Sequence, residues 1–341
     1  MKIKKVSKVS GRLDIRDPFI LGANHYDKYP EGNGKMAPKS YIPGRMIGSD
    51  FSDTAPWRMY HGDKVPGFPQ HPHRGFEIAT IVPEGLVDHF DSKGSKGRYG
   101  NGDVQLMSAG SGVMHSEMFP LLHDDKPNTL RLFQIWINLP AKSKMSEPDY
   151  KMLWSEDIPV ASITNSAGST VKIKVIIGEY YGVKALGALK NSWAADPKHH
   201  MGIALIDMDA HTEFKLEKVS PTMNRYLFYY DGEDVLNIEG TQIAKSHMAD
   251  LAGDQEIVIR SGNSSAKLLL LEGEPINEPV AAYGPFVMNT KKELMESFDE
   301  FQRTQFGGWP WGEQESDIIN DKNAGRFASY QFDKVMDKPR G

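Results

Sequence analysis

Short apolar runs, each closed by a glycine or proline turn, recur along the chain from residue 76 onwards. In the first half they predict strands at residues 77–83, 86–91, 104–107, 112–118 and 130–139, with a shorter candidate at 57–60. The run at 130–139 is apolar on both faces of an extended chain, which indicates a strand packed on both sides. Short strands at this spacing favour an antiparallel barrel or sandwich.

The same pattern resumes in the second half. It predicts strands at residues 171–177, 202–208, 226–230, 235–238, 256–259 and 266–271. Leu227–Gly232 stands where Ala79–Gly85 stood, and Gly253-Asp254 repeats Gly102-Asp103. The run at 266–271 likewise repeats 130–139. We interpret this order as a weak internal repeat of one barrel.

The remaining segments differ in composition. Lys2–Lys8 is predicted to be a solvated, fraying terminus, and residues 25–53, rich in Gly, Pro and Tyr, an ordered excursion from the barrel. Residues 140–157 are interpreted as a polar connector and 279–289 as a loop.

A helix is predicted near the end of the chain. Thr290 and Glu293 form a capping-box pattern, Leu294, Phe298 and Phe301 make one apolar stripe, and Gly307-Gly308 ends it. The tail beyond it is predicted to lie along the surface. The expected fold is therefore all-β, with two tandem antiparallel β-barrel or jelly-roll domains and short helices. We expect domains at residues 1–145 and 146–288, followed by a helix and tail packing on the barrels at 289–341.

Composition narrows the possible functions. The 341 residues carry a formal net charge of −5 without a block of like charge, so a nucleic-acid partner is not expected. No run approaches the ~18 apolar residues of a membrane span, and no signal peptide is predicted. The chain has no cysteine, which excludes disulfides, iron–sulfur clusters and thiol catalysis. Any metal must therefore use His, Asp or Glu, and a cytoplasmic location is expected.

Two pairs of polar residues stand out in the first half. Side chains alternate along a strand, so His71 and His73 share one face, and His115 and Glu117 share a face of another strand. If these strands lie opposite each other in a barrel, three imidazoles and a carboxylate converge in its interior. Burying such a cluster without a cation is costly, and its donors suit a divalent transition metal.

Spacing leaves the fourth ligand open. Glu77 shares parity with His73, although a bulge at Gly75 could turn it away, and Glu117 is the other candidate. Arg74 could equally orient a ligand through a carboxylate or form a structural ion pair. Most remaining histidines are predicted to be surface residues, with His61 and His123 flanking the site in sequence. These histidines are His25, His61, His89, His123, His199, His200, His211 and His247.

The second half lacks the metal donors. Lys218–Arg225, which precedes the strand at 226–230, contains no histidine pair, and no His-x-Glu follows Gly253. The second barrel is therefore expected to stabilise or shield the first.

Several long motifs resemble the pirin family of the cupin superfamily. They are Asp17-Pro18-Phe19, Gly67–Glu77, Gly102–Met118, Gln134–Met145 and Gly284–Thr290. The chain departs from the family pattern in its longer excursion at 25–53 and its extended tail after Phe306.

The resemblance implies a bicupin with metal in the N-terminal barrel only. It implies the ligands His71, His73, His115 and Glu117, and so favours Glu117 over Glu77. The implied metal is usually Fe²⁺, with Zn, Ni, Mn, Co or Cu as alternatives in purified protein. Bacterial members resembling this chain can show quercetin 2,3-dioxygenase activity. Animal members act as nuclear co-regulators whose iron state changes their binding surface.

Our first hypothesis is a dioxygenase that opens a flavonol such as quercetin with O₂, in which Glu117 also accepts the substrate's hydroxyl proton. The alternative is a non-catalytic iron-binding redox sensor that binds a protein partner. Its surface would use the excursion and tail, which with their flanks contain Trp57, Trp309 and Trp311. A purely structural metal ranks last, because open coordination positions are unnecessary for that role.

Overall fold

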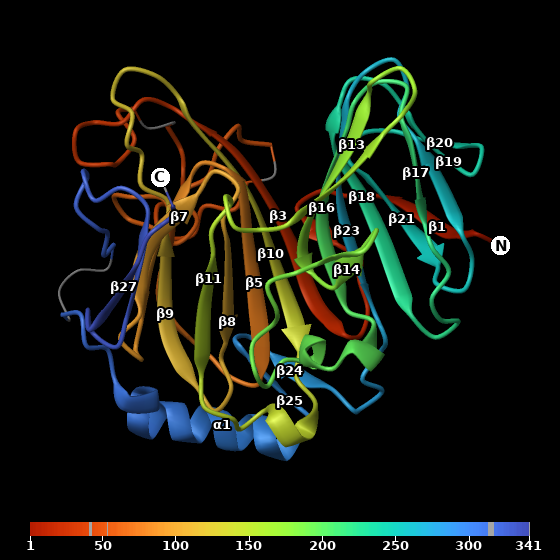
Figure 1. Ribbon diagram of the computed structural model, residues 1–341. Helices are drawn as coiled ribbons and strands as arrows, with labels where there is room; N and C mark the ends of the chain where they lie inside the picture. The colour runs from red at the N-terminus through yellow and green to blue at the C-terminus, as the bar shows by residue number, and fades with distance from the viewer. Residues whose placement is uncertain (41–42, 53, 313–316, 341) are drawn as a thin grey trace. The chain divides into compact units, whose positions relative to one another are not determined.

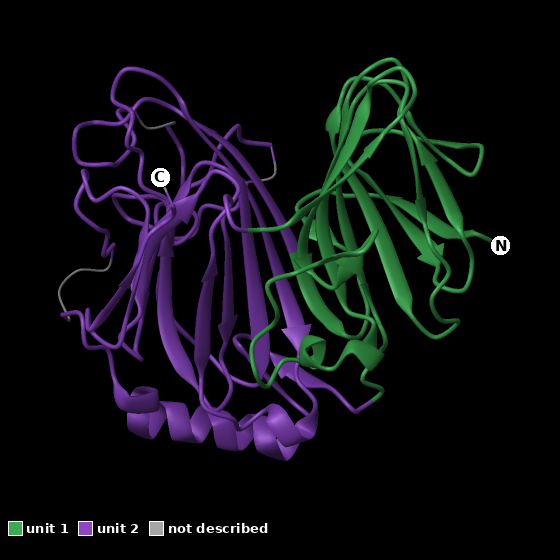
Figure 2. Ribbon diagram, in the orientation of Figure 1, with its two compact units in different colours: residues 1–22, 158–277 green, residues 23–157, 278–341 purple. Residues whose placement is uncertain are grey.

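The structure is a computed structural model that describes residues 1–40, 43–52, 54–312 and 317–340. Its chain divides into two compact units, and each combines segments that are distant in sequence (Figure 2). Unit 1 contains residues 1–22 and 158–277, and unit 2 contains residues 23–157 and 278–341. Both units are antiparallel β structures, which confirms the all-β fold class. The division differs from the boundaries expected at 145 and 288, because the first strand of the chain pairs within unit 1.

Unit 2 is built from two facing sheets (Figure 1). One runs in the order β11-β8-β5-β10-β3 and the other in the order β27-β26-β7-β6-β9-β4. The strands are β3 (Phe19–Tyr29), β4 (Gly67–His73), β5 (Phe76–Glu84), β6 (Leu86–Asp91), β7 (Lys96–Gly100), β8 (Val104–Ser108), β9 (Val113–Met118), β10 (Asn128–Asn138), β11 (Asp149–Leu153), β26 (Phe327–Tyr330) and β27 (Val335–Asp337). β5 and β10 are buried along most of their length, as their apolar sequences predict.

Unit 1 repeats this plan with a seven-stranded sheet, β1-β21-β18-β23-β16-β13-β12, and a four-stranded sheet, β17-β22-β19-β20. Its main strands are β1 (Ile3–Lys8), β12 (Val160–Thr164), β13 (Thr170–Ile177), β16 (Gly202–Met208), β17 (Glu213–Leu216), β18 (Asn224–Gly232), β19 (Leu236–Ile238), β20 (Thr241–Ile243), β21 (His247–Ala252), β22 (Ile257–Arg260) and β23 (Ala266–Gly273). Shorter elements of this unit are β2 (Arg12–Leu13), β14 (Glu179–Tyr180), β15 (Val183–Lys184) and the 3₁₀ turns Trp193–Ala195 and Pro197–His199. The 3₁₀ turn Ala141–Ser143 belongs to unit 2. Buried aliphatic and aromatic side chains fill the space between the two sheets.

Strand pairing gives the internal repeat an exact correspondence. The order β17-β22-β19-β20 matches β4-β9-β6-β7, and β21-β18-β23 matches β8-β5-β10. Gly253-Asp254 joins β21 to β22, so it corresponds to the turn at 109–112 between β8 and β9. The sequence-based match to Gly102-Asp103, which precedes β8, was therefore wrong by one strand.

Several segments predicted to be irregular are strands. Lys2–Lys8 does not fray along its length, because β1 pairs with β21. The 25–53 excursion starts within β3, the 140–157 connector contains β11, and the tail contributes β26, which pairs with β7. The 279–289 loop contains a hairpin of β24 (Ala281–Tyr283) and β25 (Phe286–Met288). The strand expected at 57–60 is limited to isolated bridges at Tyr60, and parts of the excursion (41–42, 53) and tail (313–316, 341) lie outside the described residues.

The predicted helix is α1 (Lys291–Thr304). Its capping box is complete, since the Thr290 side chain accepts from the Glu293 backbone and the Glu293 side chain accepts from the Thr290 backbone. The helix ends at Gln305, which is left-handed, and a 3₁₀ turn at Gln305–Gly307 follows. Phe298 packs on Phe286 of β25 with ring centroids 4.7 Å apart. Within the described residues no helix has the length and apolar character needed to cross a membrane.

Candidate metal centre

Three histidines converge in unit 2 on the adjacent strands β4 and β9. His71 lies directly opposite His115 in the register, and His73 follows two residues later on the same face. One ring nitrogen from each of the three residues lies within 4.8 Å of the others. The ring centroids are 4.4 Å apart for His71 and His115, and 4.8 Å apart for His73 and His115. The strand parity seen in the sequence therefore does bring the three imidazoles together.

Hydrogen bonds orient two of the rings. Nδ1 of His71 lies 2.8 Å from the Pro69 carbonyl oxygen, and Nδ1 of His73 lies 3.3 Å from that of Pro285. Each Nδ1–H can donate to its carbonyl, which leaves Nε2 as an acceptor or a metal ligand. Both ring nitrogens of His115 are buried and have no hydrogen-bond partner among the described residues. A buried imidazole with an unsatisfied lone pair fits a metal ligand.

The three imidazoles are neutral at physiological pH. Burial lowers the pKa of His71 to about 4, against the opposing effect of its hydrogen bond to Pro69. Burial also places the pKa values of His73 and His115 well below their usual range, and the neighbouring imidazoles lower them further. Neutral imidazole is the form that binds metals.

Glu117 lies beside this cluster on β9. Its Oε2 atom is 4.0 Å from Nε2 of His115. Thr80 donates a hydrogen bond to Oε1 at 3.1 Å, and Gln134 donates to Oε2 at 2.6 Å. Burial raises the pKa of Glu117, while the charge of His89 and the two hydrogen bonds lower it. Glu117 is not among the residues whose ligand atoms lie within 4.8 Å of one another, so its role as fourth ligand stays a prediction.

Glu77, the other candidate for fourth ligand, lies on the opposite face of β5. Thr80, which contacts Glu117, is three residues further along the strand, and side chains an odd number of positions apart point to opposite faces. Glu77 pairs across the sheet with Ser108 and Ile137 and is fully buried there. It therefore does not join the histidines.

His89 is a buried neighbour of the site that sequence reasoning assigned to the surface. On β6 it lies opposite Glu117, its ring centroid is 5.6 Å from that of His115, and it stacks on Tyr150. Its Nε2 atom is 3.2 Å from Oδ2 of Asp91, and the side chain has no exposed area. The alternation of His89 and Asp91 on the predicted strand 86–91 was the available signal, but only the β6–β9 register shows which face it serves.

His25 also differs from the prediction. It is partly buried, and its Nδ1 atom is 2.7 Å from the Tyr60 hydroxyl oxygen. Burial, together with the charge of Arg58, lowers its pKa to about 4. His61 and His123 are exposed, as predicted.

Arg74 forms a structural ion pair, which decides between its two interpretations. Its Nη1 atom is 2.9 Å from Oε2 of Glu300 in α1, and its Nε donates to the Ser111 carbonyl at 2.7 Å. The guanidinium also lies 4.3 Å from the centre of the Phe306 ring. Arg74 therefore attaches the helix to the turns next to β4 and β9, the strands that carry His73 and His115.

Aromatic rings surround the partly exposed side of the cluster. Phe68 lies 6.4 Å from His71 between ring centroids and stacks on Tyr60 at 5.0 Å. Phe51 and His61, from the 25–53 excursion and its flank, contact each other and Phe68. His71 is the only one of the three histidines that is not fully buried, and Phe68 connects it to this group of rings.

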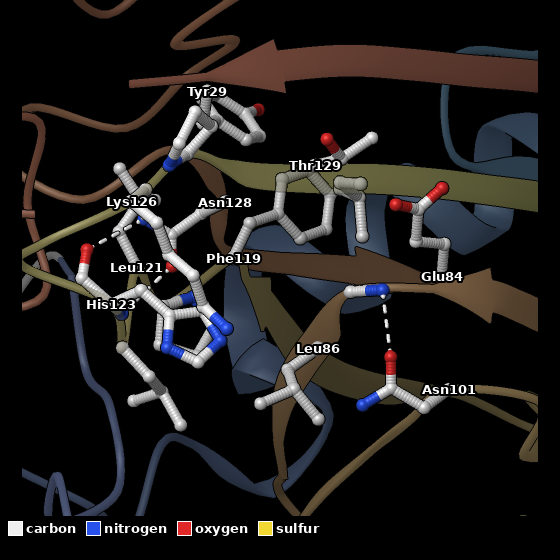
Figure 3. A pocket seen from close by; sticks show the side chains of 15 residues that line it. Tyr29, Glu84, Leu86, Asn101, Phe119, Leu121, His123, Lys126, Asn128 and Thr129 are labelled. Atoms are coloured by element: carbon white, nitrogen blue, oxygen red, sulfur yellow. Dashed lines mark hydrogen bonds between the residues drawn. The ribbon is translucent and has the colours of Figure 1, made fainter. Parts of the chain in front are cut away.

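A separate cavity of about 290 Å³ lies among the loops of unit 2 and is lined by none of the three histidines (Figure 3). Leu86, Phe119 and Leu121 line it, and Asn128 at its edge donates to the His123 carbonyl at 2.9 Å. The Asn128 side chain thus holds the loop that carries His123.

The second barrel carries apolar residues at the strands that correspond to β4 and β9. They are Phe214 and Leu216 on β17, and Ile257 and Ile259 on β22, all buried. Among the described residues, only the histidines of unit 2 form a metal-ligand cluster. The strand that corresponds to the histidine pair is β17 and not the segment 218–225, so the sequence comparison used the wrong segment.

Two jelly-roll units with a histidine cluster in one of them define a bicupin. Family models for pirin and for the pirin C-terminal cupin domain match residues 10–137 and 203–307. The chain belongs to the pirin family.

Several individual proteins are similar to the chain. A pirin-like protein of Solanum lycopersicum is 35% identical over 238 residues, which covers 69% of this chain and 75% of that protein. A Pseudomonas aeruginosa protein, provisionally named a quercetin 2,3-dioxygenase, is 35% identical over 275 residues and covers 79% of this chain and 88% of its own length. A crystal structure of quercetin 2,3-dioxygenase from Acinetobacter baumannii superposes with a TM-score of 0.69 and 25% identity, covering 90% of this chain and 98% of that one.

Proposed function

We propose that this protein is a metal-dependent dioxygenase of the quercetin 2,3-dioxygenase type, which opens the central ring of a flavonol with O₂. The observation that carries the proposal is the group of three neutral, buried imidazoles whose ligand atoms lie within 4.8 Å of one another. The names of a Pseudomonas relative and of an Acinetobacter structure support the choice of substrate.

His71, His73 and His115 would hold the metal, with Glu117 as the fourth ligand. The unpartnered ring nitrogens of His115 and the carbonyl-oriented rings of His71 and His73 fit such a group. We propose Fe²⁺, because a three-histidine, one-carboxylate set resembles the sites of non-haem iron oxygenases. When bound, the metal supplies coordination for the flavonol oxygen and for O₂ and lets the two exchange electrons.

The protein's own groups would position the substrate and move its proton. Glu117 accepts the proton of the flavonol 3-hydroxyl, and this acceptor must lie within hydrogen-bond reach of the hydroxyl. Thr80 and Gln134 hold the two oxygens of Glu117 in place. Phe68 and its aromatic neighbours offer flat apolar surfaces beside His71. By analogy with quercetinases, both oxygen atoms enter the product and carbon monoxide leaves.

Metal analysis combined with oxygen uptake tests the proposal. The purified protein should contain about one transition metal per chain and consume O₂ when quercetin is added. Glu117→Gln should keep metal and lose uptake, whereas His73→Ala should lose both. Lys291→Ala, on the exposed side of α1, is the control and should change neither.

Metal-loaded protein that consumes no O₂ with any flavonol would overturn the enzymatic proposal. That result would favour the iron-binding sensor with a protein partner instead. Protein that contains no metal after incubation with excess Fe²⁺ would overturn both the enzymatic and the sensor proposal.

A further inference from the structure

Unit 1 contains a cavity of about 610 Å³ that the proposed dioxygenase activity does not use. It lies between the end of β13, the segment 184–201 and the end of β23. Ile177, Leu189 and Met201 give it buried apolar walls. Its volume lies within the range of about 300–1,000 Å³ that is typical of small-molecule sites.

Two residues of a buried charged group, Tyr180 and Glu272, form the floor of this cavity, and the third, Arg225, lies behind them. Tyr180 donates to Oε1 of Glu272 at 2.7 Å, and Nε of Arg225 donates to Oε2 at 2.6 Å. Arg225 is only 1% exposed and Glu272 6% exposed. A Cβ atom at Gly202 would lie 2.0 Å from the Tyr180 hydroxyl oxygen, so the neighbouring strand leaves room for this arrangement only by carrying glycine. Buried ion pairs contribute little net stability, so stability alone does not explain this one.

Arg225 still has a hydrogen-bond donor to offer. Its Nη1 atom is buried and has no acceptor among the described residues. The side chain lines a recess of about 90 Å³ that shares Glu179, Tyr180, Val219 and Glu272 with the larger cavity. Both oxygens of Glu272 already accept hydrogen bonds, so the unmet capacity is that of a donor. A ligand that satisfies this floor must therefore present an acceptor oxygen.

The group occupies the end of the barrel that corresponds to the metal end of unit 2. In the pairing of β18 with β23, every second residue pair faces the interior of the barrel. Starting at the bulge next to Tyr229, the third such pair is Arg225 and Glu272. The third such pair of β5 and β10 is Phe76 and Asn138, and the Phe76 ring lies 5.1 Å from that of His73. Each barrel thus carries its buried polar chemistry at the same end.

We propose that unit 1 binds a small monocarboxylate with an apolar body. The carboxylate accepts hydrogen bonds from Arg225, for which the planar guanidinium is well suited. The apolar body lies against Met201, Leu189 and Ile177. Of the other charged residues at the cavity wall, Lys184 pairs with Glu179, Lys190 adds a positive charge and Asp196 a negative one, so Arg225 is the group that selects the anion.

Calorimetric titration of the metal-loaded full-length protein with benzoate tests this site. We expect one benzoate per chain and no comparable binding of benzylamine, which has the same ring and the opposite charge. Arg225→Lys should weaken benzoate binding at least tenfold, because lysine cannot reproduce the planar contact. Arg260→Lys is the matched control, since that arginine pairs with Glu213 on the surface, and it should leave binding unchanged.

A second variant covers the case in which Arg225→Lys fails to fold. Ala188→Trp keeps the ion pair and fills the cavity from its wall, so it should abolish benzoate binding. Its metal content and oxygen uptake with quercetin should match those of the wild type, which separates this proposal from the proposed function. The proposal is overturned if benzoate does not bind, if benzylamine binds as tightly, or if Ala188→Trp binds benzoate normally. Binding that disappears only when the metal is chelated would likewise overturn it.

Discussion

Gln134 donates a hydrogen bond of 2.6 Å to Oε2 of Glu117, and this contact joins β10 to the edge of the histidine cluster. The amide keeps one carboxylate oxygen oriented from the facing sheet, while Thr80 holds the other. Hydrogen-bond partners of a metal ligand set its direction as well as its basicity, and this is the part that Gln134 and Thr80 would play if Glu117 binds the metal as proposed.

Replacing Gln134 should therefore impair activity more than metal binding. In Gln134→Leu the carboxylate loses its stronger partner, and we expect oxygen uptake with quercetin to fall about 10- to 100-fold with metal retained. Steady-state oxygen-electrode rates and metal analysis of the same sample provide the measurement. Gln242→Leu, on the exposed strand β20, is the control. Full activity in Gln134→Leu would contradict the role given to this contact.

Metal binding should stabilise the protein through the three histidines. A ligand that binds only the folded state raises the free energy of unfolding by about 2.7 kcal/mol at 100 times its dissociation constant. Thermal unfolding of unit 2 should thus shift upward with added Fe²⁺, and the shift should disappear in His73→Ala. An equal shift in wild type and His73→Ala would place the metal elsewhere.

Acid should destabilise the metal-free protein through groups that are buried in their neutral form. The pKa of His25 is lowered to about 4 from an ordinary value of 6.5. Between these two values the unfolded chain binds a proton that the folded chain does not, so stability is complete above pH 6.5 and falls as pH drops towards 4. His71 contributes in the same direction. Chemical denaturation across this range should show a smaller decline for His25→Gln than for wild type, and equal declines would contradict the assignment.

The attachment of α1 should depend on Arg74. Arg74→Met leaves the Ser111 carbonyl and Glu300 without their buried partner, and we expect a loss of about 2–4 kcal/mol in the free energy of unfolding. Urea denaturation measures this loss. Lys292→Ala breaks an exposed pair with Glu296 on the same helix and should cost less than about 0.5 kcal/mol. Similar losses in both variants would show that the buried contacts of Arg74 contribute no more to the free energy of unfolding than an exposed ion pair.

The aromatic rings beside His71 should affect substrate binding. Phe51 is 47% exposed and contacts Phe68 and His61. In Phe51→Ala we expect KM for quercetin to rise several-fold with kcat nearly unchanged, because the lost contact serves binding of the ring and not the reaction. Phe332→Ala, at a similarly exposed phenylalanine, is the matched control. A fall in kcat at constant KM would contradict this interpretation.

Strand parity predicted that His71 and His73 share one face and that His115 and Glu117 share another, because side chains alternate along a strand. The histidine cluster also required the two strands to pair, which parity does not supply. The same rule failed to choose between Glu77 and Glu117, and His89 was assigned to the surface because the sequence showed no partner for it. Both questions depend on which strands pair with each other. The pairing of β6 with β9 cannot be deduced from the sequence of either strand. Parity shows which side chains share a face of a strand, but the pairing of the strands decides which face points into the barrel.

The strands missed by sequence reasoning share a physical character. β1 carries three lysines in six residues, and its pairing with β21 is a long-range contact that composition does not reveal. β11 and β26 lie in polar stretches rich in turns, and each completes a sheet by backbone hydrogen bonds. The helix cap at Thr290 could be predicted from the sequence, because it depends only on residues 290–293.

The interleaving of the two units has a consequence for synthesis. The barrel with the apolar interior needs residues 1–22 together with 158–277, so its opening strand leaves the ribosome long before the strand it pairs with. The unit with the histidines is completed later still, because β26 and α1 belong to it and are synthesised last. A single cut anywhere in the middle of the gene therefore cannot release either barrel with all of its strands.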